Sequence, residues 1–146
     1  PARGYSHYEK LADEQFTDAF HYTLFPNFAV SLWTDGFHFL RVRPHPTDPE
    51  QCVFDNWWYA SQPEGETAPV RTTAEIIERD AVVEHEVFEA GEKSMGRTID
   101  QDVEIFTLQQ NSMRSRGYEG AYLADQESRV ERYHELIDDY IEDRRP

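Results

Sequence analysis

The chain has 146 residues, with 14 Lys and Arg against 29 Asp and Glu, which gives a formal net charge of −15. This length suits one domain, and an aromatic content of 14% favours a packed core or pocket over disorder. Such an acidic chain repels nucleic acid and anionic membrane surfaces, so we expect neither as a partner. The single cysteine excludes a disulfide framework or a cysteine-held cluster within these residues, and the lack of disulfides favours a cytoplasmic location.

Strand-forming sequence dominates residues 20–61. Along 20–33, apolar residues at even positions alternate with a mixed set at odd positions, which predicts a strand with one apolar and one mixed face. Thr34-Asp35-Gly36 has the composition of a tight turn. Two further strands are predicted over 37–43 and 51–61, with a proline-rich break between them. Together the three strands predict an antiparallel meander.

The second half of the chain favours helices. A loop is predicted over 62–70 and a short helical or irregular segment over 76–83. Thr98 and Gln101 have the spacing of a capping box, which predicts a helix from Thr98 to Gly117. Another helix is predicted over 125–143, with an apolar stripe that packs on the sheet, formed by Val130, Tyr133, Ile137, Tyr140 and Ile141. Strands followed by helices predict an α+β fold in a single domain, 1–146.

Asp102 is the carboxylate with the most distinctive placement. It lies near the start of the predicted helix, with Phe106 and Gln109 on nearly the same side. A rigid helical turn would fix its oxygens for a hard or borderline cation. Acidic residues also favour helix starts through the helix dipole alone. The spacing therefore leaves two interpretations open, a metal ligand and a helix-start charge.

Two segments of the chain resemble the catalytic domain of the α subunit of Rieske-type aromatic-ring-hydroxylating oxygenases. The first, HYTLFPNFAVSLWTDGFHFLRVRPHPTDPE at 21–50, is similar to that family's strand with Phe-Pro-Asn followed by a hairpin. The second, DQDVEIFTLQQNSMRSRGYEGAYLADQESRVERYHELIDDYI at 100–141, is similar to its helix with an early Asp and a later Gln, a Ser-Arg-Gly turn and the closing helix.

The resemblance implies a helix-grip (START/Bet v1-like) fold, in which a curved antiparallel sheet wraps around a long C-terminal helix. It implies a mononuclear non-haem Fe(II), held by two His and one carboxylate, that uses O₂ to hydroxylate an aromatic or apolar substrate. Electrons would come from NAD(P)H through a reductase or ferredoxin and a Rieske [2Fe-2S] centre. Matched by position, the carboxylate is Asp102 and the motif's glutamine is Gln110, in a supporting role. The mixed strand face and the helix supply candidates for the substrate pocket, namely His21, Asn27, Ser31, Trp33 and Phe106.

The sequence also departs from the family pattern. It lacks the Cys and His residues of a Rieske cluster, and His7 upstream of residue 20 has no second His four or five residues on. We therefore expect the chain to be the C-terminal part of a longer α subunit, with one iron ligand of three and no activity when isolated. By analogy we expect a homo- or hetero-oligomer. The sequence leaves open a non-enzymatic helix-grip module that binds an apolar ligand, and an acidic partner-binding domain.

Overall fold

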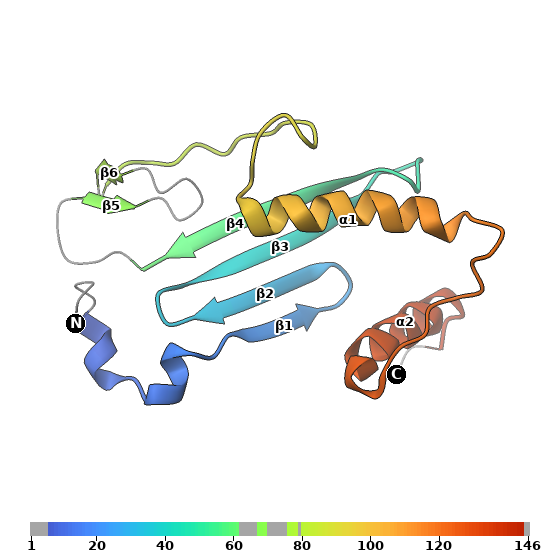
Figure 1. Ribbon diagram of the computed structural model, residues 1–146, viewed down its shortest axis with the longest axis horizontal. Helices are drawn as coiled ribbons and strands as arrows, with labels where there is room; N and C mark the ends of the chain where they lie inside the picture. Colours follow the sequence, from blue (N-terminus) through green and yellow to red (C-terminus); the bar gives the residue numbers. More distant parts are fainter. Residues whose placement is uncertain (1–5, 62–66, 70–75, 79, 145–146) are drawn as a thin grey trace. The chain divides into compact units, whose positions relative to one another are not determined.

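The computed structural model describes residues 6–61, 67–69, 76–78 and 80–144 (Figure 1). The chain forms two compact units, Pro1–Phe106 and Thr107–Pro146, and each is described by itself. The first unit contains the strands and the beginning of the long helix. The second contains the end of that helix and the last one. The single-domain organisation expected from the sequence stays a prediction.

A four-stranded antiparallel sheet forms the centre of the first unit. Its strands are β1 (Phe20–Leu24), β2 (Phe28–Trp33), β3 (Gly36–Pro44) and β4 (Cys52–Ala60), and each pairs with the next along the chain. The strands predicted over 37–43 and 51–61 are therefore confirmed. Together with the helices below, this sheet confirms the α+β class. The curvature and grip of a helix-grip fold stay predictions.

The single strand predicted over 20–33 is wrong, because the chain reverses at Phe25-Pro26-Asn27 and forms a hairpin. Pro26 has no backbone N–H to donate to a ladder, so a turn is favoured at this point. The two arms pair with Phe20 opposite Leu32 and Leu24 opposite Phe28. Partners in this register are both even or both odd in number, so each predicted face keeps its members despite the reversal.

The predicted turn at Thr34-Asp35-Gly36 is confirmed and joins β2 to β3. The Asp35 carbonyl accepts a hydrogen bond from the Ser61 amide at 2.8 Å, which ties the turn to the end of β4. Gly36 lies against the Tyr59 carbonyl, and a Cβ at position 36 would collide with that oxygen. The absence of a side chain at this position lets β3 and β4 pair as far as Gly36 and Ala60.

Short elements precede and follow the sheet along the chain. Before it come two single-turn helices, η1 (Ser6–Lys10) and η2 (Asp13–Phe16), and after it a two-stranded ladder of β5 (Thr67–Pro69) and β6 (Ile76–Glu78). The helical or irregular segment predicted over 76–83 is therefore corrected at its start, where Ile76 and Ile77 lie in a strand. β-Branched residues fit a strand well. Of the loop predicted over 62–70, positions 62–66 and 70 lie outside the described residues, and positions 67–69 are corrected to a strand, β5.

The long helix, α1, spans Arg97–Met113. It begins one residue before the predicted start, after Gly96 in a left-handed conformation with φ 97°. The predicted end at Gly117 is wrong, because the helix ends at Met113. The predicted capping box is not what holds this end. Instead, Asp100 accepts hydrogen bonds from the Ser94 hydroxyl at 2.5 Å and the Met95 amide at 2.8 Å.

The second unit ends in η3 (Asp125–Glu127) and α2 (Ser128–Ile141), which confirms a helix near 125–143. Its apolar stripe is less covered than predicted. Tyr133 and Ile137 are half-buried, while Val130, Tyr140 and Ile141 are exposed. The packing of this helix on the sheet stays a prediction.

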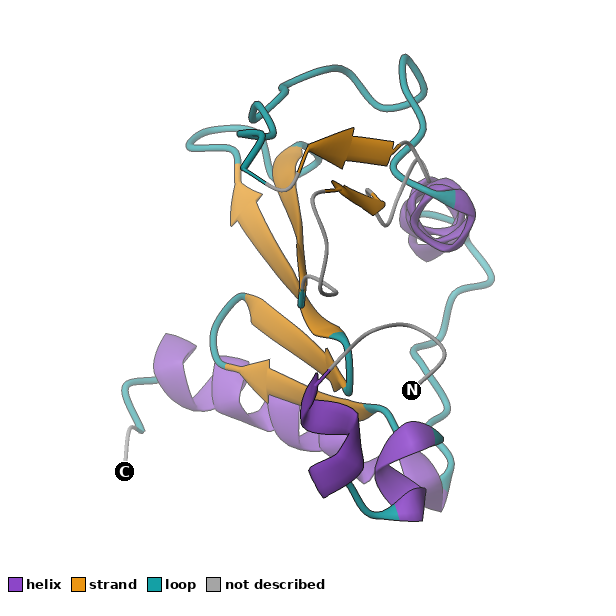
Figure 2. Ribbon diagram, turned by 90° about the vertical axis from the view of Figure 1, so that its left-hand side faces the viewer, coloured by secondary structure: helices purple, strands orange, loops and turns teal. Residues whose placement is uncertain are grey.

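The beginning of α1 lies on one face of the sheet, as Figure 2 shows with α1 seen end-on. Phe106 meets Phe54 of β4 edge-to-face, with ring centroids 6.1 Å apart. Ile99, on the same side of the helix, is 4% exposed. We call the face that bears Phe54 the helix-side face. Strand alternation places Asp55 and Trp57 on the opposite face.

Candidate functional site

A line of polar and aromatic side chains crosses all four strands on the helix-side face. It follows the register, because His21 pairs with Ser31, Ser31 with His38, and His38 with Trp58. Cross-strand partners lie about 5 Å apart and point to the same face, so these side chains form a continuous row. Two more residues contact it from the same face. We call the whole set the polar–aromatic row: His21, Ser31, Trp33, His38, Asn56 and Trp58.

Hydrogen bonds and ring contacts hold the row together. At one end, His21 Nδ1 and Ser31 Oγ are 2.7 Å apart, and the His21 ring meets Trp33 edge-on with centroids 6.4 Å apart. Towards the other end, His38 Nε2 donates to Asn56 Oδ1, and the imidazole stacks on Trp58 with centroids 3.8 Å apart. His38 is 4% exposed, so this end is buried while His21 at the edge is exposed.

The structure brings together three of the residues predicted for the pocket, His21, Ser31 and Trp33. The sequence reading did not single out His38 and Asn56. The alternation carries only a weak signal for them, since His38 shares a face with Leu40 in β3 and Asn56 is a polar residue inside an aromatic strand. Predicting that these two residues belong to the row requires the register between β3 and β4, which the sequence alone does not specify.

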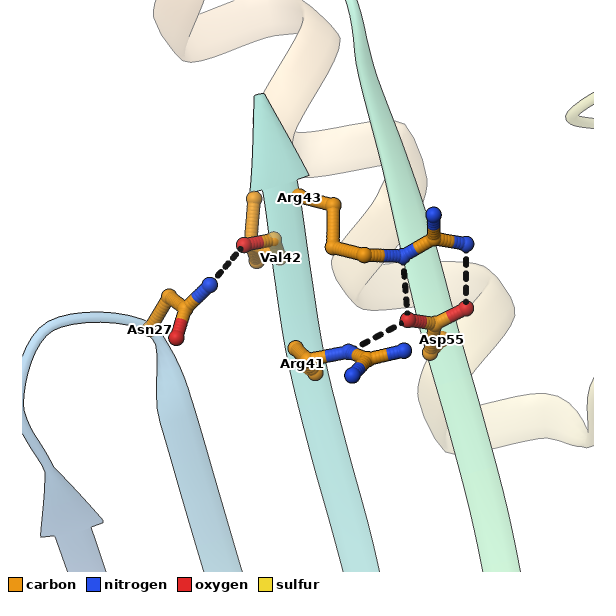
Figure 3. Close-up of polar contacts among 5 residues, drawn as sticks. All are labelled: Asn27, Arg41, Val42, Arg43 and Asp55. Atoms are coloured by element: carbon orange, nitrogen blue, oxygen red, sulfur yellow. Dashed lines mark hydrogen bonds and ion pairs between the residues drawn. The ribbon is translucent and has the colours of Figure 1, made fainter. Parts of the chain in front are cut away.

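Asn27, also predicted for the pocket, is engaged in holding the sheet. Its Nδ2 donates to the Val42 carbonyl at 2.9 Å (Figure 3). The Val42 amide donates to the Asn27 carbonyl at 3.1 Å. The side chain therefore ties the β1–β2 turn to β3. The structure does not place it in the polar–aromatic row.

Asp102 lies one turn before Phe106 on α1, on the flank shared with Ile99. In Figure 1, α1 runs opposite in direction to β4. Four residues of helix span about 6 Å, and two residues of strand about 6.6 Å. Starting from the contact between Phe106 and Phe54, Asp102 is therefore about level with Asn56 along β4. Residue 102 of the helix is thus at about the level of the buried end of the row.

The Asp102 side chain is exposed, and so is that of Gln110 farther along α1. Among the residues that the structure describes, no three His, Cys, Asp or Glu side chains gather closely enough to hold a metal ion. His21 and His38 are both hydrogen-bonded within the row. The described residues thus do not fit a complete two-histidine, one-carboxylate site, and Asp102 fits at most one ligand of it.

Asp100 fixes the start of the helix that carries Asp102. The two hydrogen bonds from Ser94 and Met95 stabilise its ionised form, and the pKa of the Asp100 carboxyl is lowered, with the Ser94 bond the larger cause. The Asp100 amide in turn donates to the Gly96 carbonyl at 3.0 Å. The first turn of α1 is therefore clasped to the loop before it.

The opposite face of the sheet carries a charged cluster among aromatic rings. Asp55 accepts two bonds from Arg43, at 2.8 and 3.1 Å, and one from Arg41 at 2.7 Å (Figure 3). The Arg41 guanidinium also lies over the rings of Phe28 and Trp57, at 5.6 and 5.1 Å. The Arg43 bonds lower the pKa of Asp55 most, Arg41 adds to this, burial opposes it, and the pKa of Arg43 is raised in return.

Chemically, the helix-side face offers an aromatic surface with a few fixed hydrogen-bonding groups, next to one exposed carboxylate on a rigid helix.

A family model described as "Ring hydroxylating alpha subunit (catalytic domain)" matches residues 1–143. The comparisons with curated proteins and with solved structures gave no match. Within the described residues, no helix has both the length and the apolar character needed to cross a membrane.

Proposed function

The chain belongs to the family of ring-hydroxylating oxygenase α subunits, in their catalytic domain, and we propose that it forms the wall that holds the substrate and supplies one carboxylate to a catalytic iron. The observation that carries this proposal is the position of Asp102. It lies on α1, whose Phe106 contacts Phe54 on the helix-side face, and residue 102 is about level with Asn56 along β4. A metal there would lie beside a surface suited to a planar apolar molecule.

In this proposal Asp102 is the carboxylate of a two-histidine, one-carboxylate set for mononuclear non-haem Fe(II). When bound, such an iron supplies the activation of O₂ at open coordination positions next to the substrate. The described residues supply no pair of histidines for it, so we propose that the other two ligands lie outside this chain. The isolated chain is then inactive. Electrons reach the intact enzyme from NAD(P)H through a reductase or ferredoxin and a Rieske [2Fe-2S] centre.

The chain's own residues have separate tasks. Asp100 holds the first turn of α1 and so orients Asp102. Phe106 and Phe54 hold the helix against the sheet through their edge-to-face contact. Gln110 supports the iron site indirectly, as hydrogen-bonded neighbours of metal ligands do. The intact protein has the helix-grip fold, with this chain as its C-terminal part, acts in the cytoplasm and assembles as an oligomer.

Substitution of Asp102 in the full-length protein tests the proposal. We expect Asp102→Ala to lose most of the bound iron and substrate hydroxylation, because one of three protein ligands is removed. Metal content is measured by atomic absorption and product by chromatography. Glu104→Ala is the matched control, since Glu104 is also an exposed acid of α1, two residues along. It should retain both iron and turnover.

Retention of iron and full turnover in Asp102→Ala would eliminate Asp102 as the ligand. The alternative function, a non-enzymatic helix-grip module, is favoured by the exposure of Asp102 together with the fixed aromatic row. It predicts a full-length protein that binds an apolar ligand with no iron bound and with equal affinity in the two variants.

A further inference from the structure

The exposed end of the polar–aromatic row has a hydrogen-bonding group that the row itself leaves unused. His21 is fixed by its bond to Ser31 through Nδ1 and by its edge-on contact with Trp33. Among the residues that the structure describes, no hydrogen-bond partner is found for His21 Nε2. Because the ring is held through its other nitrogen, Nε2 has a defined direction and is available to a ligand.

The charges around His21 select the kind of group that it can bind. The helix-side positions of the four described strands β1–β4 include no Lys or Arg. Arg41 and Arg43 lie on the opposite face, bonded to Asp55. A carboxylate bound at His21 would therefore find no permanent positive charge among the described strand residues of this face, in a chain of net charge −15. An uncharged group avoids that repulsion.

The hydrogen bond between His21 and Ser31 indicates that the uncharged group bound at His21 is a hydroxyl. If Ser31 donates to Nδ1, then Nε2 carries the proton and donates to the ligand. If Nδ1–H donates to Ser31, then Nε2 accepts from the ligand. A hydroxyl group satisfies either tautomer, because it both donates and accepts.

The rest of the row fits an aromatic body. The rings of Trp33, His38 and Trp58 are close to parallel, with interplanar angles of 8° to 22°. Because these rings stack on one another, an aromatic molecule packs edge-on against the part of the stack that stays accessible, at Trp33 and Trp58. The row extends from the edge strand β1 to β4, about 14 Å across three strand spacings. A molecule that reaches from His21 towards the helix therefore needs more than one ring.

We propose that the polar–aromatic row is a subsite for an uncharged aromatic substrate of two or more rings that carries a hydroxyl group, with His21 Nε2 bonded to that hydroxyl and Ser31 as its positioning residue. This inference rests on the proposed function, because it takes the helix-side face as the substrate side. It goes further in stating that one end of the substrate carries a polar group and that His21 binds this group.

The test uses three probes of one shape, 2-naphthol, 2-methylnaphthalene and 2-naphthoate, and the full-length protein labelled with ¹⁵N. The indole N–H signals of Trp33 and Trp58 should shift on titration, while that of Trp57, on the opposite face, should not. We expect 2-naphthol to bind about fivefold to tenfold more tightly than 2-methylnaphthalene, as one hydrogen bond allows. We expect 2-naphthoate to bind most weakly.

Three variants locate the effect. His21→Phe should bring the affinity for 2-naphthol down to that for 2-methylnaphthalene, and Ser31→Ala should reduce the difference by part. Thr23→Val is the matched control, since Thr23 is exposed on the same face of β1, two residues along, and should change nothing. Circular dichroism confirms that each variant is folded, and His21 lies at an exposed edge position that tolerates phenylalanine.

An unchanged preference for 2-naphthol in His21→Phe would overturn the inference, as would 2-naphthoate binding as tightly as 2-naphthol, or a shift of Trp57 alone. The outcome is separable from that of the iron proposal. Asp102→Ala should keep the preference for 2-naphthol even when it has lost iron and turnover. Conversely, a retained iron in that variant would refute the ligand assignment and leave the binding result standing.

Discussion

Replacement of Asp55, the one acidic residue of the described strands β1–β4, by alanine should destabilise the protein. The substitution removes one carboxylate that accepts three hydrogen bonds, two from Arg43 and one from Arg41. It leaves Arg41 over the rings of Phe28 and Trp57 without its counter-charge. Removal of one partner from a buried pair costs about 3–5 kcal/mol.

Because the two arginines are partly exposed, we expect the loss of stability to lie at or below the lower end of that range. The Asp55 side chain is 4% exposed, whereas those of Arg41 and Arg43 are 31% and 49% exposed. Water can therefore solvate both arginines in part after the loss. We expect a decrease in the free energy of unfolding of about 2–3 kcal/mol, and a melting temperature lower by about 4–12 °C for a protein of this size.

The pH dependence of this effect has a defined sign. Because the pKa of Asp55 is lowered in the folded state, its contribution is fully present above the ordinary carboxyl pKa of about 3.9. It is lost as the pH falls through the lowered value. The difference in stability between the wild type and Asp55→Ala should thus be constant from pH 7 to pH 5 and shrink below pH 4.

Urea unfolding followed by tryptophan fluorescence at pH 7, 5 and 3 measures these quantities. Asp80→Ala is the control, since Asp80 is an exposed acid with no hydrogen bond among the described residues, and it should change stability by less than about 0.5 kcal/mol. If Asp55→Ala also stays within about 0.5 kcal/mol of the wild type at pH 7, the reasoning on the buried cluster is refuted.

Three further substitutions test other parts of the structure. Asp100→Ala should open the first turn of α1, seen as faster amide hydrogen exchange at residues 95–100, and unchanged exchange there would contradict the clasp. Gly36→Ala should lower stability in urea by about 1–3 kcal/mol through the clash with Tyr59, whereas Gly117→Ala, with open space around it, should have little effect. Asn27→Ala should cost about 1 kcal/mol in the same assay by removing its bond to β3, and a neutral result would show the turn to be held by its backbone alone.

Local patterns in the sequence predicted much of this fold. Alternation along 20–33 sorted the residues onto the correct faces, and Asp35-Gly36 marked a real turn. The reversal at Pro26 was missed because the hairpin keeps odd residues with odd ones, so the alternation continues through the turn without a visible break. Register between strands is a long-range property. The pairing of His38 with Trp58, and the contact of His38 with Asn56, therefore had no local signal strong enough to find them.

Helix boundaries show the same limit on a smaller scale. The spacing of Thr98 and Gln101 fits a capping box, yet the carboxylate of Asp100 makes the bonds that hold this end of α1. Both patterns are compatible with the local sequence, and the loop conformation at Ser94 and Gly96 decides between them. The position of Asp102 on the helix was predictable from periodicity. Its level along the sheet depended on a contact between Phe106 and Phe54, 52 residues apart in the sequence.

In the hairpin of β1 and β2, even-numbered residues pair with even-numbered ones and odd with odd. This register constrains how many residues the turn can gain or lose. If one residue were inserted or deleted at Pro26 while β2 stayed in place, the side chains of β1 would exchange faces. His21 would then lie on the face that carries Arg41 and Arg43, and Tyr22 would lie on the helix-side face. A change of two residues would preserve the faces and only slide the strand. Natural variation in this turn should therefore come in pairs of residues, and a laboratory insertion of a single glycine should abolish the contact between His21 and Ser31 while the remaining strands stay paired.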